Sequence, residues 1–182
     1  MLKINAKTYL IENIPYHQSI NCDERPIGVD IDSIVIHCIS LPSGVYDNNH
    51  IIDLFQNKLD TTQDKSFISL TNLKVSAHIL VRRDGRIIQF VPFNLRAWHA
   101  GVSQYKNREN FNDFSIGIEI EGTPTTEYTN IQYEKLIQLI ASIKLCYPRI
   151  TDDNIIGHSD ISPNRKKDPG DFFMWDKIKD KK

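Results

Sequence analysis

The residues best suited to chemistry gather in one short stretch of the chain. Ile156–Gly170 reads IGHSDISPNRKKDPG and holds an imidazole, two carboxylates and an ammonium group, from His158, Asp160, Asp168 and Lys166. Proline and glycine punctuate the stretch, which predicts an irregular loop leaving a short strand. A hydrolytic zinc site takes three His, Asp, Glu or Cys ligands and leaves its fourth position for water. We therefore predict that His158 and Asp168 are two metal ligands.

A third ligand must come from elsewhere in the chain, and His37 is the best candidate. It follows the apolar run Ile34–Ile36, which is typical of a buried strand. The end of such a strand is a usual position for site residues in α/β sheets. On the loop sequence alone, a plain turn beside a surface histidine stays open as the alternative.

Two carboxylates on a predicted strand, Phe114–Glu121, supply a general-base candidate. Its isoleucines share one face, and Gly117, Glu119 and Glu121 share the other. An inward carboxylate is costly when unpaired, so either this face is solvated or one glutamate faces the metal. We take Glu119, deeper in the strand, as the base, and expect Glu121 to lie nearer to solvent.

Three further side chains are candidates from their position. Lys166 lies between Arg165 and Lys167 in a basic run that is normally solvated, but above a metal its ammonium group would stabilise an oxyanion. Trp98 and His99 lie in a loop rich in recognition-type side chains. His99 either meets a sugar or peptide there or plugs the loop.

Two other residues have simpler explanations. His78 lies on a predicted strand, where a lone histidine is more often structural than a ligand. Cys38 follows His37, but adjacent strand residues point to opposite faces, which argues against a Cys/His nucleophile.

The remaining patterns predict the elements that position these residues. Residues 1–32 read as an irregular wrap around the domain. The expected elements are strands over 33–37, 114–121 and 154–157, a hairpin over 74–91 that turns at Asp84-Gly85, short helices over 50–59 and 172–179, and a longer helix from Thr129, with a Thr-x-x-Gln capping box, to Pro148. This mixture predicts one α/β (α+β) domain over 1–182, with a mixed central sheet flanked by helices.

Composition limits the classes of protein that fit. The chain has 182 residues, 40% hydrophobic and 25% charged, with a net charge of −1, so neither nucleic-acid nor anionic-membrane binding is indicated. The N-terminus lacks the apolar core of a secretory signal. The three widely spaced cysteines form no disulfide framework, so we expect a reduced, cytoplasmic protein with no obligate protein partner.

Five segments together resemble the zinc N-acetylmuramoyl-L-alanine amidase and peptidoglycan-recognition-protein superfamily. They occur in the family's order and are Ile34–Gly44, Lys74–Gly85, Arg96–Tyr105, Asn112–Thr123 and Gly157–Gly170. The resemblance implies a Zn²⁺ ion in a groove on one side of the sheet, held by His37, His158 and Asp168. It also implies catalytic roles for Glu119 and Lys166.

The implied reaction is hydrolysis of the amide between the muramyl lactyl group and L-alanine in an anhydro-muropeptide. The expected substrate contacts are Trp98, His99, Lys74, Arg96 and Arg108, the three basic residues for carboxylates of the stem peptide. Three positions depart from the family pattern: Cys38 where Asn is frequent, Lys74 where Arg is common, and Asn110 in place of a basic residue. Two rival hypotheses are a non-catalytic muropeptide-binding module and an exported amidase that acts on intact wall.

Overall fold

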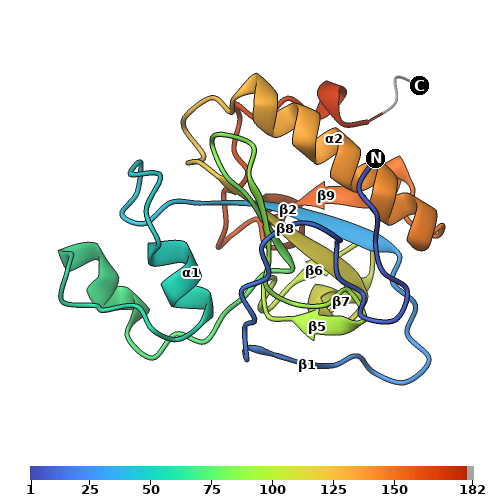
Figure 1. Ribbon diagram of the computed structural model, residues 1–182, viewed down its shortest axis with the longest axis horizontal. Coiled ribbons are helices and arrows are strands. Elements are labelled where there is room, and N and C mark those ends of the chain that lie inside the picture. Colours follow the sequence, from blue (N-terminus) through green and yellow to red (C-terminus); the bar gives the residue numbers. More distant parts are fainter. Residues whose placement is uncertain (180–182) are drawn as a thin grey trace.

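The computed structural model describes residues 1–179. A five-stranded sheet lies at its centre (Figure 1). The strand order is β4–β3–β8–β2–β9. These strands are β2 (Ser33–Ile39), β3 (Ile79–Val81), β4 (Ile87–Gln89), β8 (Ser115–Glu121) and β9 (Ile155–Gly157). Strands β3, β8, β2 and β9 pair in parallel and β4 pairs antiparallel with β3, which confirms the predicted mixed sheet.

One face of the sheet is covered by helix α2 (Asn130–Cys146) (Figure 1). The predicted capping box is present: the Thr129 hydroxyl accepts from the Gln132 N–H, and the Gln132 side chain accepts from the Thr129 N–H. The alternate isoleucines of β2 and β8 pack against this helix in the largest buried apolar cluster. Ile137 of this helix lies outside that cluster and is 44% exposed.

The other face of the sheet carries the candidate site residues of β2 and β8. Val35 and Ile156 pack there against Phe111, Phe114 and Ile161. Helix α1 (His50–Phe55), shorter than predicted, and the 3-10 helix η1 (Lys65–Leu70) lie to one side (Figure 1). A separate apolar cluster fills the space beneath α1.

Short elements complete the described chain. They are β1 (Cys22–Glu24) paired with β5 (Leu95–Ala97), β6 (Gln104–Tyr105) paired with β7 (Arg108–Glu109), helix α3 (His158–Ile161), and the 3-10 turns η2 (Phe111–Asp113), η3 (Asp152–Asn154) and η4 (Trp175–Lys177). The predicted hairpin is therefore too long, and the predicted helix over 172–179 is reduced to η4. The expected domain runs to residue 182, so its last three positions lie outside the described residues.

The N-terminal segment is fastened to the domain by the guanidinium group of Arg25. This group donates hydrogen bonds to the carbonyl oxygens of Phe93, Asn112, Asp113 and Ser115, at 2.9–3.2 Å. Burial lowers the pKa of Arg25 to about 10, so the group stays charged at neutral pH.

None of the helices within residues 1–179 is both long and apolar enough to cross a bilayer.

Candidate metal centre and catalytic site

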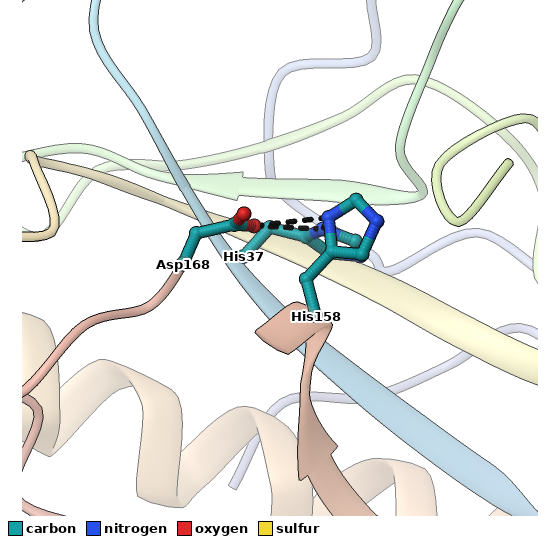
Figure 2. A group of neighbouring side chains, drawn as sticks. All are labelled: His37, His158 and Asp168. Carbon is teal, nitrogen blue, oxygen red and sulfur yellow. Dashed lines mark hydrogen bonds and ion pairs between the residues drawn. The ribbon is translucent and has the colours of Figure 1, made fainter. Parts of the chain in front are cut away.

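The structure brings the three predicted ligands together. His37 lies near the end of β2, His158 opens α3, and Asp168 lies in the loop that follows, and all three side chains converge (Figure 2). His37 Nδ1 lies 2.9 Å from His158 Nδ1 and 3.2 Å from Asp168 Oδ2, and His158 Nδ1 lies 3.1 Å from the same oxygen. Three ligands of a tetrahedral Zn²⁺ ion are about 3.3–3.5 Å apart, so this triangle has nearly the size that such an ion requires.

Hydrogen bonds on the far side of each imidazole leave Nδ1 free to bind a metal. His158 Nε2 lies 3.1 Å from the carbonyl oxygen of Ala100, which can only accept, so Nε2 carries the hydrogen. His37 Nε2 lies 2.9 Å from His99 Nδ1 and donates to it when His37 Nδ1 is a ligand. Such outer partners orient metal-binding histidines and fix their tautomers.

The ionisation states also suit a metal. Burial lowers the pKa of His37 to about 4, with partial opposition from its hydrogen bond to Asp168, so the ring is neutral at pH 7. Burial alone would raise the pKa of Asp168, but hydrogen bonds with His158 and His37 outweigh it and hold that pKa well below its usual value. Neutral imidazole and ionised carboxylate are the forms that bind metals.

The ligand loop is more ordered than the sequence predicts, because it opens with the single turn of α3. Asp160 Oδ2 accepts from the Gly157 N–H at 2.7 Å, which makes Asp160 a capping residue of that turn. The Ser159 N–H donates to the carbonyl oxygen of Asp168 at 2.9 Å and holds the ends of the loop together. Arg165, from the basic run, donates to the Ala100 carbonyl at 2.7 Å.

Glu119 lies beside the cluster with an unsatisfied oxygen. It is the register partner of His37 in the parallel pair β2–β8. Its Oε2 is buried and has no hydrogen-bond partner among the described residues. Burial and the charge of Asp168 raise the pKa of Glu119 well above its usual value, whereas Lys166 lowers it. A carboxyl group with a raised pKa next to a metal site is suited to accept and return a proton.

Glu121 does not lie near solvent, so that expectation is wrong. Its side chain is 1% exposed and pairs with Arg82 at 3.2 Å. Its carboxylate also accepts from the N–H groups of Arg83 at 3.0 Å and Asp47 at 3.3 Å. A buried ion pair with added hydrogen bonds is a structural arrangement, so Glu119 is left as the glutamate of this strand that faces the cluster.

Lys166 is half-buried on the ligand loop, and its positive charge lowers the pKa of both His37 and Glu119. A hollow of about 680 Å³ adjoins the loop and is lined by Ser159, Lys166 and Pro169 among others. None of His37, His158 and Asp168 is among its lining residues, so the hollow lies beside the loop and does not contain the cluster.

Cys38 faces away from the cluster and packs against the apolar core beneath α2. Burial raises the pKa of its thiol to about 12. A thiol in that state is a poor nucleophile at neutral pH, and the position agrees with the argument from strand alternation.

The five predicted substrate contacts lie in different surroundings. His99 is buried behind His37, and half-buried Trp98 donates through its indole N–H to Asp23 at 3.1 Å.

The three basic residues differ in their partners. Arg96 pairs with Asp23 and Asp113, and Arg108 pairs with Asp32 at 2.9 Å. Lys74 is exposed at a hollow of about 500 Å³ beside Leu54 and Asn57.

Sequence reasoning missed three residues that support the cluster: Arg165, Asn112 and Ser115. Arg165 belongs to a short basic run, and the sequence predicts that such a run is solvated. Asn112 lies in the turn before β8, where its residue type is common for local reasons, and Ser115 is the first residue of β8. Their contacts join segments far apart in the chain, so no local pattern marks them.

The three side chains of the cluster could hold a metal ion, and a buried carboxylate lies beside them. This arrangement is typical of metal-dependent hydrolases. Residues 27–171 match the family described as N-acetylmuramoyl-L-alanine amidase. The chain is 49% identical over 160 residues to a protein of Haemophilus influenzae named 1,6-anhydro-N-acetylmuramyl-L-alanine amidase AmpD, covering 88% of this chain and 87% of that protein. The chain therefore belongs to the N-acetylmuramoyl-L-alanine amidase family.

Solved structures agree with this assignment. A crystal structure of a selenomethionine derivative of AmpD superposes with a TM-score of 0.91 at 43% identity, covering 94% of this chain and 96% of that chain. The Escherichia coli amidase AmiD, solved with the substrate anhydro-N-acetylmuramic acid-L-Ala-D-γ-Glu-L-Lys, has a TM-score of 0.60 at 28% identity. That match covers 87% of this chain and 64% of AmiD.

Proposed function

We propose that this protein hydrolyses the amide bond between (1,6-anhydro-)N-acetylmuramic acid and L-alanine in muropeptides, with zinc held by His37, His158 and Asp168. The observation that carries the proposal is the triangle of two imidazole nitrogens and one carboxylate oxygen, 2.9–3.2 Å on each side. Family membership and the names of the relatives supply the substrate class.

The ligand types favour zinc. Two neutral imidazoles and one carboxylate are a ligand set found in zinc hydrolases, and three protein ligands leave one position open. When bound there, Zn²⁺ lowers the pKa of water and polarises the carbonyl of the substrate.

Glu119 is the proposed general base. Its unpartnered Oε2 accepts the proton of the attacking water, and its raised pKa favours holding that proton. The same oxygen then delivers the proton to the departing amine of L-alanine. Because Glu119 and His37 are register partners in adjacent strands, the base is fixed relative to the first ligand.

Lys166 is the proposed oxyanion residue. Its ammonium group lies near enough to influence the pKa of both His37 and Glu119. A positive charge at that position stabilises the negative charge that develops on the carbonyl oxygen in the transition state.

Of the predicted substrate contacts, Lys74 and Trp98 remain the better supported. Lys74 is exposed at a hollow, and Trp98 is half-buried. Arg96 and Arg108 would have to leave their carboxylate partners to bind a stem-peptide carboxylate. His99 lies behind a ligand rather than at the surface.

We further propose that the protein acts in the cytoplasm on turnover products of the cell wall.

The deciding experiment is mass spectrometry of products after incubation with a soluble anhydro-muropeptide and, separately, with intact wall. Release of free stem peptide that stops with a chelator and returns with zinc supports the amidase. Cleavage of the soluble substrate alone supports a role in recycling. Bound zinc without cleavage would favour a binding module, and release from intact wall would favour a wall-degrading amidase.

A further inference from the structure

The outer hydrogen bonds of both histidine ligands end in one pair of adjacent residues. His37 Nε2 meets the ring of His99 at 2.9 Å, and His158 Nε2 donates to the carbonyl oxygen of Ala100 at 3.1 Å. The His99–Ala100 segment follows β5 and belongs to none of the elements that carry the ligands. The orientation of both imidazoles therefore depends on where this segment lies.

One side chain, Asn112, binds the backbone N–H groups of both residues in the segment. Asn112 Oδ1 accepts hydrogen bonds from the backbone N–H groups of both His99 and Ala100, at 3.0 Å and 2.8 Å. Asn112 Oδ1 is thus connected to His37 through His99 and to His158 through Ala100.

The His99 ring is held from two further directions. Its Nε2 lies 3.3 Å from the hydroxyl of Ser115, which in turn donates to the carbonyl oxygen of Phe111. This arrangement keeps the hydrogen of His99 on Nε2 and leaves Nδ1 to accept from His37. Gly117 lies against the ring, and any side chain at that position would overlap it.

Asn112 is itself fixed from outside the site. It lies in the 3-10 turn η2, and its carbonyl oxygen accepts from Arg25 at 3.1 Å. The turn also receives the Arg25 guanidinium at the Asp113 carbonyl, at 2.9 Å. The turn that carries Asn112 is therefore held by hydrogen bonds from Arg25. A residue that positions others must itself be fixed in this way.

We propose that Asn112 is a positioning residue for the metal centre, which acts through the His99–Ala100 segment on the orientation and tautomer of both histidine ligands at once. The proposal rests on the proposed function, because it takes His37, His158 and Asp168 as the zinc ligands. Loss of an outer partner of a zinc ligand usually lowers metal affinity about 10–100-fold. Asn112 lies one step further out but supports the partners of two ligands, so its loss is expected within that range.

The test compares zinc affinity in the full-length protein and its variants, measured by competition with a chromophoric chelator. Asn112→Ala removes the shared acceptor and is expected to weaken zinc binding about 10–100-fold. Asn112→Asp keeps an accepting oxygen at the same position and is expected to stay within about threefold of the wild type. The absorption spectrum of the Co²⁺-loaded proteins is a second measurement. We expect this spectrum to shift in Asn112→Ala and to stay unchanged in Asn112→Asp.

Gln89→Ala is the matched control. Gln89 is a buried amide whose Oε1 accepts from the Ile11 N–H at 2.8 Å, but it lies on β4, with β3 and β8 between it and β2. Its loss should lower the thermal midpoint without changing zinc affinity. If Asn112→Ala fails to fold, Asn112→Ser replaces it, because the serine hydroxyl is too short to reach both N–H groups.

The outcomes separate the two proposals. A wild-type protein that does not bind zinc overturns both. A wild type that binds zinc, with Asn112→Ala binding equally well, overturns the positioning role alone. Weakened zinc binding in Asn112→Asp as in Asn112→Ala, or in Gln89→Ala as well, would also overturn it, because the effect would then not follow the accepting oxygen.

Discussion

His37 and Glu119 are register partners in parallel strands, β2 and β8, so the first proposed ligand and the proposed base leave the sheet side by side on one face. A slip of one residue in this pairing would turn one of them toward α2. The isoleucines between the polar residues pack against that helix and hold the register. The catalytic geometry and the apolar core are therefore set by the same alternation.

Glu119→Gln should keep the fold and the bound zinc but lose turnover. Glutamine has nearly the shape of glutamate but cannot accept the proton of the attacking water, so kcat should fall at least about 10²-fold. Metal content and steady-state kinetics on a muropeptide check both parts. A variant with near-normal kcat would show that the base is another group.

Asp168→Ala should lose zinc. The carboxylate supplies one corner of the ligand triangle, and its side chain is only 13% exposed. Metal analysis after dialysis checks the prediction. Asp171→Ala is the matched control, because Asp171 is an exposed aspartate three residues along the same loop, and it should keep its zinc. Equal metal content in the two variants would remove Asp168 from the ligand set.

Lys166→Met should lower kcat about 10²-fold with little change in KM, because the charge acts on the transition state. Methionine keeps the length of the side chain without the charge. Lys167→Met, one residue along, alters an exposed lysine and should leave both constants near the wild-type values. A change confined to KM in Lys166→Met would indicate a role in binding only.

Glu121→Gln should destabilise the protein without removing zinc. It leaves the Arg82 guanidinium, 4% exposed, without its buried partner, a change that typically costs about 3–5 kcal/mol. Urea unfolding measures the loss. Glu12→Gln, which breaks the surface pair with Lys3, should cost less than about 1 kcal/mol. Similar losses in both variants would contradict the assigned burial of the Arg82–Glu121 pair.

The sequence predicts this fold best where local patterns and tertiary packing coincide. The strand with alternating isoleucines and the helix that begins at Thr129 are found within one residue of their predicted starts. Elements held mainly by distant contacts are predicted less well. The segment 172–179 has helical spacing, yet it forms only a 3-10 turn at Trp175–Lys177.

The same distinction applies to the site. His158 and Asp168 stand close in the sequence, and His37 directly follows an apolar run, so their convergence could be predicted. Glu121 could not be placed, because its partner Arg82 lies 39 residues away. The roles of Asn112 and His99 depend on hydrogen bonds between loops, which no periodicity reveals.

Through Arg25, the N-terminal segment does more than cover the domain, because it also holds the turn that carries Asn112. The family match begins at residue 27, two positions after the guanidinium that braces the turn carrying Asn112. The stretch that the family model matches is thus shorter than the stretch on which the proposed metal geometry depends. A chain trimmed to residues 27–171 would keep all three proposed ligands and both proposed catalytic residues, yet lose the hydrogen bonds from Arg25 to the turn behind them.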